Sequence, residues 1–192
     1  MGGRRGLRAD SEPSGMAELV RSIYILRGIG FMVKWLGLTQ NQYIGFFALG
    51  LALFALQEAP YIVMPLIRME SNPLMEMQDK SAVLSVLEKI VMVSCVVVLL
   101  FLVRGDARWF SLGSAKEIIF FCVAMAALAG YFIGWFLYFR GHQSLPLILI
   151  TLVALPPVYY ACIGLWRGNT VLACLGGFAL IIHTLNVWNN LK

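Results

Sequence analysis

Apolar residues come along this chain in long blocks that short polar segments separate. The blocks cover about residues 43–67, 81–103, 117–139, 145–166 and 169–188. Each holds roughly the 20 residues that an α-helix needs to cross the hydrocarbon part of a bilayer. Alternating segments of roughly ten residues, which are typical of membrane-spanning strands, do not occur, so the blocks predict helices. The predicted fold class is all-α: an integral membrane bundle of five transmembrane helices over residues 43–192.

The first forty residues follow a different pattern. Residues 1–15 are rich in glycine, arginine and serine and have no apolar partner to bury, so we expect a disordered tail. Residues 16–42 are apolar, but Arg21, Arg27 and Lys34 interrupt them at intervals of six and seven. Arg27 would cost a few kcal/mol at the centre of a bilayer. We therefore predict an amphipathic helix over 16–42 that lies in the headgroup layer. A sixth transmembrane helix is the alternative.

Composition supports the membrane assignment. The 192 residues are 60% hydrophobic and 13% charged, whereas soluble domains are roughly 45–50% apolar and about 25% charged. The lipid bilayer is therefore the first expected partner of the chain.

Lysine and arginine in the short connections predict the orientation of the bundle. With a cytoplasmic N-terminus, the inner segments hold ten of them: Arg4, Arg5, Arg8, Arg21, Arg27, Lys34, Arg104, Arg108, Lys116 and Arg167. The outer segments hold four: Arg68, Lys80, Arg140 and Lys192. We therefore predict a cytoplasmic N-terminus and an external C-terminus. The net charge of +5 then suits an anionic inner leaflet, and nucleic acid is not expected as a partner.

Several ionisable residues fall at one depth in this topology. Glu58 lies nine residues before the outer end of the first span. Glu88 and Lys89 lie seven and eight residues after the outer start of the second. His183 lies five residues before Trp188, near the outer end of the fifth. At about 1.5 Å per residue, these side chains sit roughly 8–14 Å below the outer surface. Ionisable residues inside a membrane usually mark a functional site.

Helical spacing places other polar residues beside them. The second span carries a stripe at intervals of three and four: Ser81, Ser85, Glu88, Met92 and Cys95. The fifth carries a similar one: Gly176, Ala179, His183, Asn186 and Asn190. Such stripes should turn away from lipid. Pro60 and the pair Pro156–Pro157 remove backbone donors and should kink their helices around the same region.

These positions predict an outward-facing polar pocket. It would bind a small solute or ion, as in a small transporter or the binding subunit of a membrane complex. The predicted ligand-binding residues are Glu58, Gln57, Glu88, Lys89, His183, Asn186, Tyr131 and Trp135. We expect Glu58 to face Lys89, so that this pair sets the charge selectivity.

Two other functions fit the same residues. One is a non-catalytic assembly or regulatory membrane protein, in which the polar side chains only fix helix contacts. The other is a membrane-embedded hydrolase or transferase, with Glu58 and His183 as acid and base. The sequence contains no GxSxG, HExxH or CxxC motif, which favours a protein that is not an enzyme.

We accordingly predict no catalytic residue, no metal and no cofactor. Besides lipid, the partners to expect are a small-molecule or ion ligand, a partner membrane subunit and a second copy of the chain.

Overall fold

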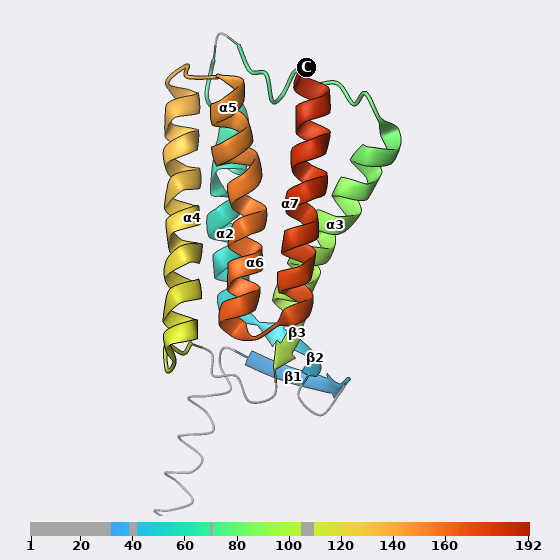
Figure 1. Cartoon of the computed structure of the whole chain (residues 1–192), viewed down its shortest axis with the longest axis vertical. Coiled ribbons are helices and arrows are strands. Elements are labelled where there is room, and N and C mark those ends of the chain that lie inside the picture. Colours follow the sequence, from blue (N-terminus) through green and yellow to red (C-terminus); the bar gives the residue numbers. More distant parts are fainter. Residues whose placement is uncertain (1–31, 39–41, 70, 105–109) are drawn as a thin grey trace, which may run out of the picture. The chain divides into compact units, whose positions relative to one another are not determined.

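The computed structural model describes residues 32–38, 42–69, 71–104 and 110–192, all within the unit Phe31–Lys192. These residues are mostly helical (Figure 1). Five helices in this part of the chain are long and apolar enough to cross a membrane: Ala48–Leu66, Ala82–Phe101, Ala115–Phe139, Leu145–Arg167 and Thr170–Leu191. They confirm the predicted all-α membrane bundle of five transmembrane helices, and the protein is an integral multi-pass membrane protein. The tail 1–15 and residues 16–31 and 39–41 of the predicted helix 16–42 lie outside the described residues.

The spans divide into shorter elements. They are α2 (Ala48–Val63) with the 3₁₀ turn η1 (Met64–Leu66), α3 (Ala82–Phe101), α4 (Ala115–Phe139), α5 (Leu145–Leu147) with the π-helix η2 (Ile148–Ala154) and α6 (Leu155–Arg167), and α7 (Thr170–Leu191). The π-helix comes directly before Pro156–Pro157, where missing backbone donors disfavour a regular α-helix. Two ends can be told apart in Figure 1. The loop end carries residues 71–80 and the C-terminus, and the strand end carries the β-strands.

Side chains cap the helices where the sequence turns apolar. The Ser81 hydroxyl accepts a hydrogen bond from the Leu84 amide at 3.4 Å at the start of α3. The Asn169 side chain accepts one from the Leu172 amide at 3.0 Å at the start of α7. Gly168, with φ 63°, ends α6 in the left-handed conformation that glycine adopts without strain. These caps fix the turn between α6 and α7 at the strand end.

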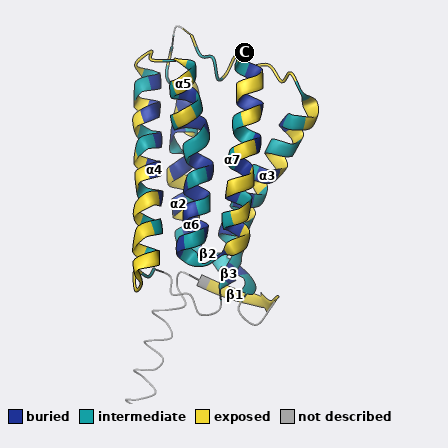
Figure 2. Ribbon diagram, viewed as in Figure 1, coloured by how far each residue is buried: buried dark blue, intermediate teal, exposed yellow. Residues whose placement is uncertain are grey.

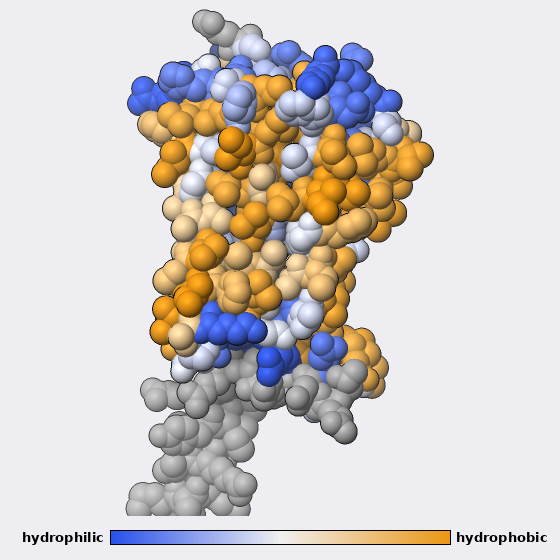
Figure 3. All heavy atoms as spheres, viewed as in Figure 1, coloured by the Kyte–Doolittle hydropathy of each residue, from blue (hydrophilic) through white to orange (hydrophobic). Residues whose placement is uncertain are grey.

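Apolar side chains cover the outside of the bundle. On α3 the exposed apolar residues recur at intervals of three and four: Val83, Val86, Ile90, Val93 and Val97. Their face lies opposite Ser85, Cys95 and Leu99, which are buried (Figure 2). Figure 3 shows hydrophobic side chains along the helices and hydrophilic ones gathered toward the two ends. This pattern is the one that a bilayer requires of a helical bundle.

A small antiparallel sheet lies at the strand end. It consists of β1 (Met32–Gly37), β2 (Gln42–Phe47) and β3 (Leu102–Arg104), in that order. Residues 32–37 were predicted as the end of the amphipathic helix 16–42, and they form a strand instead. The pairing needs Gly45, where a Cβ would lie 1.9 Å from the Val33 carbonyl oxygen. The first span accordingly begins at Ala48 and not near residue 43.

Glycines bring three of the helices into close contact. A Cβ on Gly176 of α7 would lie 2.5 Å from the Ala161 nitrogen of α6. A Cβ on Gly134 of α4 would lie 2.2 Å from the Thr151 hydroxyl of η2. Small residues permit such close packing where lipid supplies no hydrophobic drive between helices. The span α5–α6 therefore sits tightly between α4 and α7, and contact on both sides explains why its residues are the most buried of the bundle.

Candidate functional site

A cavity of about 410 Å³ lies between α2, α3, α6 and α7, on the side of the loop end. Its described lining consists of Gln57, Glu58, Tyr61, Met77, Asp79, Glu88, Lys89, Met92, Pro156, His183 and Asn186. Six of the eight residues predicted for the site are among them: Gln57, Glu58, Glu88, Lys89, His183 and Asn186. The remaining two, Tyr131 and Trp135, stand behind the cavity wall and contact residues that line it.

The Glu88 carboxylate of α3 joins α3 to α7. One of its oxygens contacts Nδ1 of His183, and the other accepts a hydrogen bond from Nδ2 of Asn186. The side chains of His183 and Glu88 are only 12% and 16% exposed. A carboxylate in such surroundings needs these donors, because an unpaired buried charge is strongly unfavourable. The predicted polar stripes of the second and fifth spans thus meet each other.

Lys89 does not pair with Glu58, which corrects the expectation from the sequence. Its ammonium lies 3.9 Å from Oδ2 of Asp79, and its side chain is 74% exposed. The other Asp79 oxygen accepts a hydrogen bond from the Ser85 hydroxyl at 2.8 Å. The physical reason is reach: Asp79 sits just before α3 on the same side of the helix, so the flexible lysine turns toward the loop end and water.

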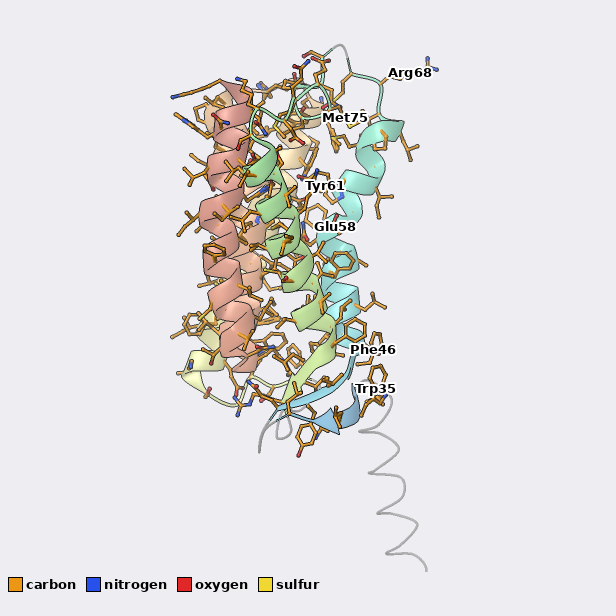
Figure 4. All side chains as sticks on the ribbon, turned by 90° about the vertical axis from the view of Figure 1, so that its right-hand side faces the viewer. Trp35, Phe46, Glu58, Tyr61, Arg68 and Met75 are labelled. Carbon is orange, nitrogen blue, oxygen red and sulfur yellow. The ribbon has the colours of Figure 1, made fainter. Side chains whose placement is uncertain are left out.

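Glu58 stands apart from this network. Within the described part of the chain, no lysine, arginine or histidine forms an ion pair with its carboxylate. The residue is partly buried. Figure 4 shows Glu58 and Tyr61 reaching from α2 into the space beside α3. Glu58 is therefore the cavity carboxylate whose charge the neighbouring side chains leave uncompensated.

Gln57, the neighbour of Glu58, makes hydrogen bonds to two other helices. Its Oε1 accepts a hydrogen bond of 2.7 Å from the Tyr160 hydroxyl, and its Nε2 donates one of 3.5 Å to the Tyr131 hydroxyl. Gln57 is 2% exposed. These bonds tie α2 to α4 and α6, and they give Tyr131 a place in the wall behind the cavity.

Trp135 supports the same wall from α4. Its ring is 1% exposed and meets the Tyr61 ring edge-on, with 5.1 Å between the centroids. Trp135 also lines a separate apolar groove of about 260 Å³, which is shared by Ala59, Pro60, Val63, Phe132, Phe136 and Phe139. It positions Tyr61 and does not itself border the polar cavity.

The segment 71–80 covers the loop end of the cavity. The Tyr138 hydroxyl donates a hydrogen bond of 2.7 Å to the Asn72 side chain. At the other edge, the Lys80 amide donates one of 3.0 Å to the Asn190 side chain. The segment is thus fastened to α4 on one side and to α7 on the other, and it forms a roof.

Five lining residues are absent from the predicted set: Tyr61, Met77, Asp79, Met92 and Pro156. Tyr61 follows Glu58 by three positions, and Met92 follows Glu88 by four. Helical spacing therefore carried enough information to add both to the site. Met77 and Asp79 lie in the irregular roof, where no periodicity exists to place them.

The lining suggests which chemistry the cavity suits. None of its described lining residues is a serine, a threonine or a cysteine. In the described part of the chain, no group of three histidine, cysteine or acidic residues could hold a metal ion. The side chains present are those that bind through charge, hydrogen bonds and apolar contact.

Comparison of the chain with protein-family models, with curated proteins and with solved structures gives no match. The function is therefore inferred from the site alone.

Proposed function

We propose that this protein binds a small solute in the cavity between α2, α3, α6 and α7, as a small transporter or as the binding subunit of a membrane complex. The observation that carries the proposal is a cavity of about 410 Å³ whose polar lining comes from three spans, α2, α3 and α7, and from the roof, while Pro156 of α6 adds an apolar wall. Cavities that hold small molecules measure roughly 300–1,000 Å³. Ionisable residues within a bundle are unfavourable unless they pair or face such a cavity.

Each predicted residue has a role in this proposal. Glu58 sets the charge preference, Lys89 pairs with Asp79 at the roof, and His183 and Asn186 supply hydrogen bonds near Glu88. Gln57 keeps α2 in place, with Tyr131 and Trp135 behind it.

Orientation decides the side from which the solute arrives. The excess of lysine and arginine in the segments of the strand end supports a cytoplasmic strand end and an external loop end. The cavity then opens within the outer half of the bilayer. Pro60 in α2 and the π-helix before Pro156 provide points where the helices can bend as the solute passes.

The test uses the full-length protein, purified in mild detergent and studied by native mass spectrometry. We expect the wild type to retain a small molecule, and Glu58→Gln to lose it while staying folded. Glu76→Gln is the matched control, because it removes the same charge from the roof segment at a residue outside the cavity lining. Equal retention by all three proteins, or none by any of them, would contradict the proposal.

An assembly role remains the second candidate because of one observation. The contacts of Glu88 with His183 and Asn186 also lock α3 to α7. In that case no variant, His183→Ala included, would change the retention of a ligand.

A further inference from the structure

We propose that the solute is a small amphiphilic amine, an organic cation with an apolar body that reaches the cavity from the bilayer between α2 and α3. This inference rests on the binding function proposed above and names the class of its ligand. It draws on three features of the cavity: the balance of charge, the apolar walls and the side that is left open.

The charge of the lining favours a cation. Three carboxylates border the cavity, those of Glu58, Asp79 and Glu88, against one ammonium, that of Lys89. The lining therefore carries two more negative than positive charges when His183 is neutral, and one more when it is protonated. Because Lys89 pairs with Asp79, the excess centres on Glu58 and Glu88. A monovalent cation placed between these two carboxylates lowers that excess by one charge without disturbing the existing pairs.

The other walls suit an apolar body. Tyr61, Met77, Met92 and Pro156 complete the lining. The Tyr61 ring is fixed by its edge-on contact with Trp135. A tyrosine face attracts ammonium groups as well as hydrocarbon, and methionine thioethers adapt to the shape of an apolar ligand. An amine with an aromatic or branched alkyl body satisfies both kinds of wall, whereas a bare inorganic cation leaves the apolar one unused.

Three sides of the cavity are closed by hydrogen bonds. Glu88 joins α3 to α7 through His183 and Asn186. Gln57 joins α2 to α6 through Tyr160. The roof 71–80 is fastened at both of its edges, as described above.

The side between α2 and α3 has no such fastening. The two helices approach closely near the strand end, where a Cβ on Gly50 would lie 3.0 Å from the Leu99 carbonyl oxygen. Glu58 and Glu88 lie roughly 12–16 Å further along these helices, at about 1.5 Å per residue. In the described part of the chain, no hydrogen bond, ion pair or ring contact joins α2 to α3 at that level. A ligand that arrives there comes from among lipid tails, which is why we assign it an apolar body.

The experiment compares three ligands that differ only in their head group with a fourth that lacks the apolar ring. The probes are 4-phenylbutylamine, 4-phenylbutanol and 4-phenylbutyrate, and n-butylamine supplies the same head group without the ring. Each is titrated against the full-length protein in lipid nanodiscs by calorimetry, with empty nanodiscs as the blank for partitioning into lipid. We expect 4-phenylbutylamine to bind at least about tenfold more tightly than each of the other three.

Two variants connect this preference to the cavity. Glu58→Gln should weaken the binding of 4-phenylbutylamine about tenfold or more and leave 4-phenylbutanol unchanged. Glu76→Gln should change neither, since Glu76 lies outside the lining. If 4-phenylbutanol binds as tightly as 4-phenylbutylamine, or 4-phenylbutyrate binds more tightly, the ligand is not a cation. The proposed solute site is unaffected by that result. Tight binding of n-butylamine would show that the ligand needs no apolar body, and it would overturn that part of the proposal. Failure of all four probes to bind overturns this inference, and the native mass spectrum then decides whether the solute site itself survives.

Discussion

Two pairs of helices in this bundle meet in opposite ways. The pair α6 and α7 meets through small residues, with Gly164 against Ala173 and Gly176 against Ala161. The pair α2 and α3 approaches closely at Gly50, near the strand end, and further along it carries Glu58 and Glu88 on either side of a cavity. The first pair leaves no room for a side chain between the backbones. The second leaves room for a ligand.

The contrast between these two pairs shows how a membrane bundle obtains a polar site. Hydrophobic burial does not distinguish helix from lipid, so close contact requires small residues or hydrogen bonds. The α6–α7 pair has the small residues. Beyond Gly50, hydrogen bonds to other helices hold α2 and α3, and ionisable residues occupy the opening between them. The rigid pair is thus the scaffold against which the open pair is positioned.

The largest expected effect tests the tight pair. Gly176→Leu should lower the free energy of unfolding by about 3 kcal/mol, because overfilling a packed interface forces the backbones apart. Gly177→Leu is the matched control, since a Cβ at Gly177 would meet no atom within 4 Å. Unfolding in mixed detergent, followed by circular dichroism, measures both. Equal stability of the two variants would show that α6 and α7 do not pack as described.

The next effect concerns the hydrogen bonds that hold α2. Gln57→Leu leaves the Tyr160 and Tyr131 hydroxyls without their partner, and we expect a loss of about 2 kcal/mol. Gln143→Leu, which removes an exposed bond to the Ser71 carbonyl, should cost about 0.5 kcal/mol or less. The same unfolding measurement applies. A Gln57 variant as stable as the wild type would mean that α2 is held by packing alone.

A smaller effect is expected at the contact between α3 and α7. His183→Ala removes one of the two donors to Glu88 and leaves Asn186 in place, so we expect a loss of about 1 kcal/mol. His142→Ala, at an exposed histidine after α4, should change stability by less than about 0.5 kcal/mol. Hydrogen exchange of the α3 amides adds a local readout, with faster exchange expected in His183→Ala alone. Unchanged exchange in α3 would contradict the role given to this contact.

Much of the bundle could be predicted because the bilayer directly sets the length of each span and the polarity of its outer face. The end of the first span was expected near residue 67 and the helical segment closes at Leu66. The last span was expected from residue 169 and α7 starts at Thr170. The two polar stripes also face each other, since lipid cannot satisfy Glu88 or Asn186.

The strands β1 and β2 were not predicted from the sequence, and the reason is physical. Apolar residues with occasional lysines fit both an amphipathic helix and a short hairpin, and periodicity alone does not separate them. The polar run Thr39-Gln40-Asn41 between two segments rich in aromatic and β-branched residues was the available signal. Sheet formation also depends on β3, which lies more than fifty residues away in the sequence.

The side-chain pairings within the candidate site could not be predicted from the sequence, for a different reason. Glu88 and Lys89 are adjacent, so the sequence places both at one depth but does not tell which of them turns toward the first span. Asp79 decided the outcome by holding Lys89 at the roof, and its position depends on how the segment 71–80 is fastened. Long-range hydrogen bonds of this kind leave no periodic trace in a sequence.

The most direct test of the account asks whether water reaches Glu58 inside the membrane-spanning bundle. Cys95, Cys122, Cys162 and Cys174, all free thiols, are replaced by alanine, and a single cysteine is placed at Glu58 or, for comparison, at the lipid-exposed Leu56. A small uncharged methanethiosulfonate, which can enter by the lipid route and reacts with the thiolate form of a cysteine, is then added to the protein in nanodiscs. We predict rapid labelling at position 58 and none at position 56. An unreactive cysteine at 58 in folded protein would contradict the cavity on which the proposed function depends.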